Sequence, residues 1–121
     1  MSDRSTSSEW FHDLANKSRD DLMRAASPAN LDRLRAHIAV SLPGTSPPQD
    51  LDEERFADVV LQLRENEKAW NQATMAALIN ADDLFHQGRA SDARSELHGF
   101  AASCPWSTFK EVALDQATNY G

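Results

Sequence analysis

Apolar residues recur at intervals of three and four positions along most of the chain, which is the spacing of one face of an α-helix. No stretch alternates apolar and polar residues as a half-buried β-strand does. The pattern therefore predicts an all-α fold, a compact helical bundle of about five helices with one long central helix.

The first predicted helix begins between residues 6 and 8, where Thr6 and Glu9 have the spacing of a capping box. Polar residues 17–21 interrupt its apolar face. The second helix begins at the pair Ser27–Pro28, because serine caps a helix and proline suits its first position. The apolar positions of this pair are Trp10, Phe11, Leu14, Leu22, Met23, Leu31, Leu34, Ile38 and Leu42.

A segment rich in proline and glycine, LPGTSPPQD at residues 42–50, separates this helical pair from the rest of the chain. Nothing breaks a helix between residues 50 and 87, so we expect one long helix there. At the polar stretch RENEK, residues 64–68, it either continues, which is favoured, or bends. Its apolar stripe is Phe56, Val60, Leu63, Trp70, Ala77, Ala81 and Leu84. We expect a disordered N-terminus at 1–6 and a single helical domain over 7–121, in which 42–50 is a linker.

Gly88 ends the long helix, and a shorter helix is predicted over 92–102 before Pro105. The resulting hairpin, about residues 74–107, resembles one tetratricopeptide repeat, in which two antiparallel helices pack through small residues. The matching positions are Ala81, Leu84, Gly88, Ala93, Leu97 and Pro105, and the departures are Ala77, Asn80 and Phe100. No second copy occurs, so the hairpin is expected within a bundle, with a last helix over 107–119, and not in a repeat array.

Ligands of tetratricopeptide repeats lie against the first helix of each pair. The resemblance places this face on Met75, Leu78, Asp82, Phe85 and His86. Because three of the five are apolar, two arrangements are open. In the favoured one, the N-terminal helices fill the face through Trp10, Phe11, Leu31 and Leu34. In the other, the face is open and binds an amphipathic partner helix.

Acidic residues outnumber basic ones by 19 to 12, which gives a net charge of −7. No basic cluster is present to neutralise phosphates, so nucleic-acid binding is not expected. No long apolar run predicts a membrane span, and the N-terminal residues lack the apolar core of a signal peptide. With a single cysteine, Cys104, the cytoplasm is the expected compartment.

No motif of a catalytic, metal or phosphate site occurs, so we expect no enzyme activity, cofactor or metal. Asp82 and His86 have metal-ligand spacing, but two ligands do not make a site, and a solvated helix face is favoured. The remaining histidines are scattered: His12, His37 and His98. Cys104 is expected to be a structural thiol. The tryptophans, Trp10, Trp70 and Trp106, either anchor the core or contact a partner.

Three functions are compatible with these features. The favoured one is a small acidic protein–protein interaction module that binds a protein or peptide. The second is a dedicated inhibitor, an antitoxin or immunity protein whose acidity would steer it to a basic toxin or enzyme. The third is a structural subunit of an oligomer, in which a homodimer is one option.

Overall fold

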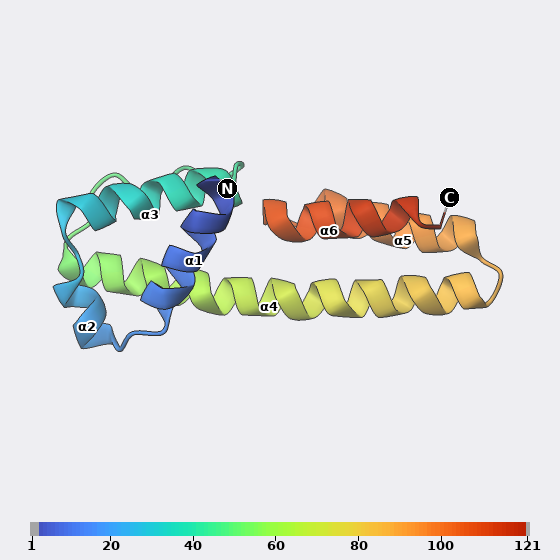
Figure 1. Ribbon diagram of the computed structural model, residues 1–121, viewed down its shortest axis with the longest axis horizontal. Coiled ribbons are helices and arrows are strands. Elements are labelled where there is room, and N and C mark those ends of the chain that lie inside the picture. The colour runs from blue at the N-terminus through green and yellow to red at the C-terminus, as the bar shows by residue number, and fades with distance from the viewer. Residues whose placement is uncertain (1–2, 121) are drawn as a thin grey trace. The chain divides into compact units, whose positions relative to one another are not determined.

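The computed structural model describes residues 3–120, which form six helices and no strand (Figure 1). The helices are α1 (Asp3–Ala15), α2 (Arg19–Arg24), α3 (Pro28–Ser41), α4 (Glu53–His86), α5 (Ala90–Ser103) and α6 (Ser107–Thr118). The all-α prediction is confirmed. The described residues have six helices where the sequence suggests about five, because the polar stretch that interrupts the first apolar face ends α1 and Ser18 caps a separate α2.

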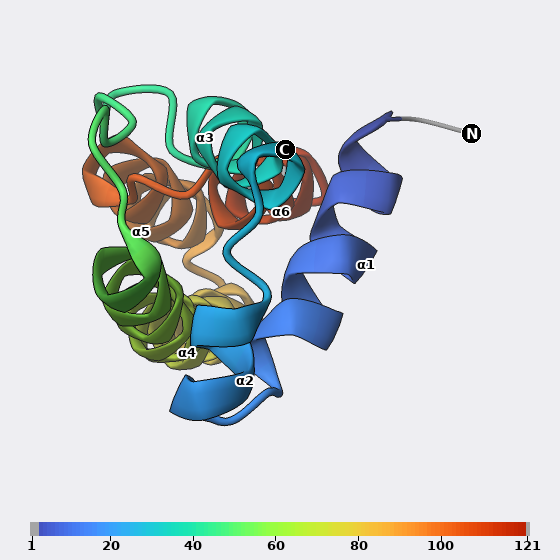
Figure 2. The same cartoon turned by 90° about the vertical axis from the view of Figure 1, so that its left-hand side faces the viewer.

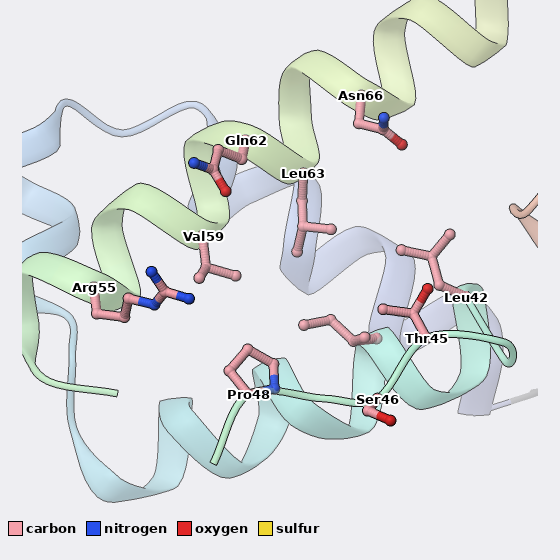
Figure 3. Close-up of a pocket in the computed structure, with 10 residues that line it drawn as sticks. Leu42, Thr45, Ser46, Pro48, Arg55, Val59, Gln62, Leu63 and Asn66 are labelled. Carbon is pink, nitrogen blue, oxygen red and sulfur yellow. The ribbon is translucent and has the colours of Figure 1, made fainter. Parts of the chain in front are cut away.

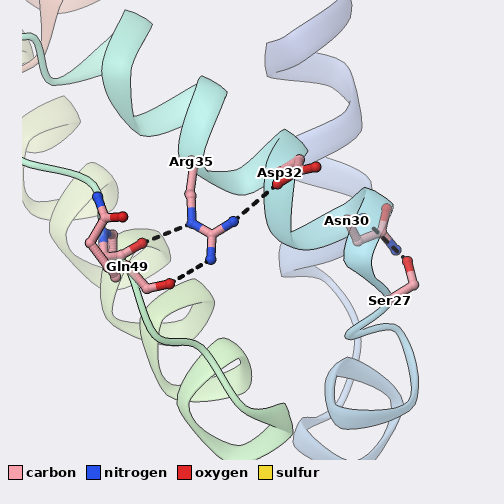
Figure 4. Close-up of polar contacts among 6 residues, drawn as sticks. Ser27, Asn30, Asp32, Arg35 and Gln49 are labelled. Atoms are coloured by element: carbon pink, nitrogen blue, oxygen red, sulfur yellow. Dashed lines mark hydrogen bonds and ion pairs between the residues drawn. The ribbon is translucent and has the colours of Figure 1, made fainter.

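Of the two helix starts predicted in the N-terminal part of the chain, the first differs from the structure and the second agrees with it. α1 begins at Asp3, so Thr6 lies inside the helix, and residues 3–6, expected to be disordered, are helical. Met1 and Ser2 lie outside the described residues. α3 begins as predicted: Ser27 Oγ accepts a hydrogen bond from the N–H of Asn30 at 3.2 Å, and proline occupies the first turn (Figure 4).

The long helix α4 is continuous, as predicted. It begins after Asp52, whose carboxylate accepts a hydrogen bond from the N–H of Arg55 at 2.7 Å. The contacts of the chain nevertheless divide within this helix, into an N-terminal unit that ends at Asn66 and a C-terminal unit that begins at Glu67. Residues 61–73 contain no buried side chain, and the polar stretch at 64–68 lies at their centre. The single domain stays a prediction.

The N-terminal unit buries large apolar side chains from all four of its helical segments. α1 crosses from α3 to the first part of α4 (Figures 1 and 2), and Arg64 Nη1 of α4 donates to the carbonyl oxygen of Ala15 at the end of α1, at 2.9 Å. The core residues are Phe11, Leu14, Ala15, Leu22, Leu34, Ile38, Leu42, Leu51, Phe56, Ala57, Val59 and Val60. This set includes most of the predicted apolar positions of the first two helices.

Arg35 of α3 binds the backbone of the segment between α3 and α4. Residues 42–52 are not helical, and they include the predicted linker. Arg35 of α3 donates from Nε to the carbonyl of Pro48 at 2.9 Å and from Nη2 to that of Gln49 at 2.7 Å (Figure 4). Its Nη1 bonds Asp32 at 3.0 Å. Because the guanidinium satisfies two carbonyls, it ties this segment to α3.

In the C-terminal unit, α4 and α5 form an antiparallel hairpin that turns at Gly88 (Figure 1). Gly88 has a φ of 78°, a left-handed conformation that favours glycine. Its N–H bonds the carbonyl of Phe85 at 3.0 Å, and the next N–H, of Arg89, bonds the carbonyl of Leu84 at 2.9 Å. These two bonds are a Schellman motif, which satisfies the last carbonyls of α4.

The core of the C-terminal unit consists mainly of alanine. α6 lies beside α5, and both pack against the end of α4 (Figure 1). The buried cluster is Ala77, Ala81, Ala93, Leu97, Ala101, Ala113, Ala117 and Tyr120. Ala81 and Ala93, predicted to lie where the hairpin helices touch, are both fully buried in it. Small side chains let the helices approach closely.

Candidate functional site

The predicted ligand face of α4 lies within the C-terminal unit, and much of it is exposed. Met75 is 53% exposed and Phe85 is 42% exposed, whereas Leu78 is half-buried against the alanine cluster. Asp82 and His86 are exposed. The face therefore combines exposed apolar side chains with a carboxylate, Asp82, which lies about two turns after Met75 and about one turn before Phe85.

Three of the five predicted residues line a hollow of about 310 Å³ between α4 and α6. We call it the α4–α6 hollow. Its lining residues are Met75, Leu78, Ile79, Asp82, Asp83, Gln116 and Tyr120. The remaining two predicted residues, Phe85 and His86, lie at its side, where Phe85 contacts Tyr120 and His86 contacts Asp82.

Tyr120 forms a fixed wall of the α4–α6 hollow. Its ring lies 4.9 Å from the ring of Phe85, centroid to centroid. Its hydroxyl accepts a hydrogen bond from Gln116 Nε2 at 3.2 Å, and its carbonyl accepts one from Arg94. Only 6% of Tyr120 is exposed. These contacts place the Tyr120 ring against Phe85 at the edge of the hollow.

The rim of the α4–α6 hollow is negatively charged. Asp82 and Asp83 both line it, and Asp82 Oδ2 lies 3.4 Å from His86 Nδ1. His86 Nδ1 also lies 2.8 Å from the backbone carbonyl of Asp82. Within the part of the chain that the structure describes, no three His, Cys, Asp or Glu side chains are placed to hold a metal ion.

Of the four N-terminal residues expected to fill the face, Trp10 and Phe11 have aromatic or cation–π contacts within their own unit. Phe11 is buried and stacks on His37, with ring centroids 4.5 Å apart. Trp10 is half-buried, and the guanidinium of Arg33 lies 4.9 Å from its ring. Leu34 is fully buried. That these helices fill the α4 face stays a prediction.

The other two tryptophans belong to the C-terminal unit. Trp106 is buried and lies near Phe109, whereas Trp70 is half-buried and meets Phe100 edge to face, with ring centroids 5.9 Å apart. Both have an aromatic neighbour in the unit, which agrees with an anchoring role.

A second hollow, of about 330 Å³, lies in the N-terminal unit between α3, the 42–52 segment and the first part of α4 (Figure 3). Its residues are Ile38, Leu42, Thr45, Ser46, Pro48, Arg55, Val59, Gln62, Leu63 and Asn66. Val59 and Leu63 point from α4 toward the segment that Arg35 holds (Figure 3). Arg55, its one charged side chain, is flanked in sequence by Asp52, Glu53 and Glu54. Because these carboxylates are negatively charged, they disfavour the binding of an anionic ligand at this arginine.

Two side chains with potentially reactive groups, His37 and Cys104, are buried. Burial, with a further contribution from His12, lowers the pKa of His37 to about 4, so its imidazole is neutral near pH 7. Burial raises the pKa of the Cys104 thiol, which donates to the carbonyl of Trp106 at 3.6 Å. A protonated thiol is a weak nucleophile, and this agrees with the structural role expected for Cys104.

Four lining residues of the α4–α6 hollow were missed from the sequence: Ile79, Asp83, Gln116 and Tyr120. The first two could have been found, because Ile79 and Asp83 follow Met75 at intervals of four and lie on the same helix face. The last two could not, because Gln116 and Tyr120 reach the hollow only through the packing of α6.

Comparison of the chain with models of known families, with curated proteins and with solved structures gives no match. The resemblance to a tetratricopeptide repeat therefore stays a prediction. Among residues 3–120, no helix is long and apolar enough to span a bilayer.

Proposed function

We propose that this chain is a protein–protein interaction module and that it binds its partner on the α4 face beside the α4–α6 hollow. The proposal rests on the distribution of the exposed large apolar side chains between the two units. Of the six exposed among residues 9–120, five belong to the C-terminal unit: Met75, Ile79, Phe85, Val112 and Leu114. Clustered exposed apolar groups are typical of interaction surfaces.

The helical spacing of the exposed residues supports the same face. On α4, Leu78 and Ile79 follow Met75 by three and four residues, and Phe85 follows Leu78 by seven residues, which is about two turns. A partner helix recognises such a groove through apolar anchors at intervals of three and four. A buried, neutral His37 and a protonated Cys104 supply no reacting group at this surface.

The test compares two substitutions of exposed residues. Ile79→Asp places a charge in the hollow, where 58% of the isoleucine is exposed and little stability depends on it. Leu114→Asp is the matched control, because Leu114 is exposed on α6 but does not line the hollow. Phe85→Asp is a poorer choice, because it also breaks the contact with Tyr120.

Affinity purification with the wild-type chain, Ile79→Asp and Leu114→Asp measures the effect. We expect partners that the wild type and Leu114→Asp both retain and that Ile79→Asp loses, while circular dichroism shows that all three are folded. Partners that Ile79→Asp retains in full would place the binding surface elsewhere. The absence of any partner would contradict the proposal.

A dedicated inhibitor of a basic enzyme or toxin is the second candidate. The net charge of −7 and the two carboxylates at the hollow favour it, since charge of this kind accelerates encounter with a basic surface. A gene for a toxin beside the gene for this chain, and loss of that toxin's activity on addition of the chain, would distinguish the inhibitor from a general module.

A further inference from the structure

The carboxylates at the α4–α6 hollow have no cationic side chain on their own stretch of helix. Residues 69–88 contain no lysine and no arginine. Asp82 is near His86, at 3.4 Å, and Asp83 has no ion-pair partner among the side chains that the structure describes. The two carboxylates thus leave an uncompensated negative charge next to exposed Met75 and Ile79.

The arginines that come next in the sequence are engaged elsewhere in the C-terminal unit. Arg89 Nε lies 2.8 Å from Asp92 Oδ2, in the first turn of α5. Arg94 donates to the carbonyl oxygen of Tyr120. Both guanidinium groups therefore have acceptors that keep them from Asp82 and Asp83. Among the described residues, no lysine or arginine forms an ion pair with Asp82 or Asp83, so a partner can supply a cation to this rim.

The order of the residues along α4 defines the complementary surface. Met75 and Ile79 come first, the two aspartates follow after one turn, and His86 ends the stripe. From Met75 to His86 the helix rises about 16 Å, which is about three turns. A partner of the same length would place apolar side chains at one end and a cationic side chain at the other.

We propose that the occupant of the α4 face is a basic amphipathic helix of about three turns. Its apolar side chains contact Met75, Leu78 and Ile79, and its lysine or arginine side chains contact Asp82 and Asp83. This inference rests on the proposed function and adds the chemistry of the partner. A second copy of the chain is disfavoured, because a two-fold contact centred on the hollow brings the aspartates of both copies together.

The probes are three synthetic helical peptides of the same length and the same apolar pattern. One carries lysine and arginine at its polar positions, the second glutamine, and the third glutamate. Isothermal titration measures their binding to the full chain at low and high salt. Analytical ultracentrifugation of the chain alone measures self-association.

The expected result is binding of the basic peptide, weaker binding of the neutral one and none of the acidic one. The double variant Asp82→Asn/Asp83→Asn should weaken the basic peptide roughly tenfold, which is the order expected for two exposed ion pairs. The control Asp13→Asn/Glu96→Gln changes the net charge equally at exposed positions outside the hollow, and should leave affinity unchanged. Salt should reduce the binding of the wild type more than that of the double variant.

The failures of the two proposals are distinguishable. If all three peptides bind equally and Ile79→Asp abolishes binding, the face binds proteins but the basic partner is wrong. If the chain dimerises and Ile79→Asp breaks the dimer, the occupant is a second copy, which also overturns the inference. If no peptide binds, while affinity purification still recovers partners that depend on Ile79, the partner is not a basic helix. If those partners are absent too, both proposals fail.

Discussion

The two units of this chain differ in how many of their large apolar side chains are exposed to solvent. The N-terminal unit buries them: Phe11, Leu22, Leu34 and Phe56 are almost completely buried, and Val40 is its one exposed large apolar residue among those described. The C-terminal unit buries mainly alanines together with Leu97, Trp106 and Tyr120, and it leaves Met75, Ile79 and Phe85 partly in solvent.

The two kinds of core are expected to stabilise their units to different extents. A core of large side chains gains stability from the area that it removes from water. A core of alanines removes less area and relies on the close approach of its helices. The exposed large side chains of the C-terminal unit are then accessible on its surface. The comparison therefore predicts that stability depends mainly on the N-terminal core, and it is consistent with the proposed binding surface on the C-terminal unit.

The largest expected effect is the loss of a buried aromatic ring in the N-terminal unit. Phe56→Ala should lower the free energy of unfolding by roughly 3–5 kcal/mol, because Phe56 is fully buried and its removal leaves a cavity. Phe85→Ala is the matched control in the C-terminal unit, where 42% of the ring is exposed, and should lower it by roughly 1–2 kcal/mol. Urea denaturation followed by circular dichroism measures both. Equal losses would contradict the contrast between the units.

The N-terminal core should also be sensitive to acid, through His37. Its pKa falls from 6.5 to about 4 on folding, so the unfolded chain binds a proton between these values that the folded chain does not. Stability is therefore complete above pH 6.5 and decreases as the pH falls toward 4, by about 3 kcal/mol. Urea midpoints between pH 7 and pH 4 test this. His37→Gln should flatten the profile relative to wild type, whereas His98→Gln, at an exposed site, should leave it unchanged.

Local signals in the sequence account for most of the helix boundaries. Gly88 and Ser27 act where the sequence indicates, because a left-handed turn and an N-cap depend on a few neighbouring residues. The same reasoning is less accurate at α5, which was predicted over residues 92–102. The helix begins at Ala90, and no side chain caps it, while Arg89 forms an ion pair with Asp92 in its first turn.

Features that depend on distant segments could not be predicted. Arg35 donates hydrogen bonds to the carbonyls of Pro48 and Gln49, and Tyr120 lines the hollow together with residues of α4. Both interactions join residues that are far apart in the sequence. The resemblance to a tetratricopeptide repeat indicated a face of α4 that includes Met75, Leu78 and Asp82, and these three residues line the hollow. The resemblance carries no information on which other helix covers part of that face.

The alanine core should tolerate added volume poorly. Ala93→Leu should lower the free energy of unfolding by roughly 1–3 kcal/mol, because Ala93 is fully buried in the alanine cluster and a larger side chain forces the helices apart. Ser95→Leu adds a leucine at an exposed position of α5 and should change stability by less than about 0.5 kcal/mol. Thermal and urea unfolding compare the two. If Ala93→Leu is as stable as Ser95→Leu, the helices of this unit are not closely packed there.

The smallest expected effects come from the two glycines of the hairpin, and they have opposite signs. Gly88→Ala should destabilise by about 1 kcal/mol, because its φ of 78° disfavours any residue with a Cβ, although no atom lies within 4 Å to obstruct one. Gly99→Ala should stabilise by up to about 1 kcal/mol, because Gly99 lies inside α5 with equally open space around it, and alanine is the better helix former. Both substitutions add the same methyl group in open space, so only the backbone conformation can account for a difference in sign between their unfolding midpoints. If both variants shift the midpoint in the same direction, the turn at Gly88 is not left-handed in solution, and the hairpin does not close as described.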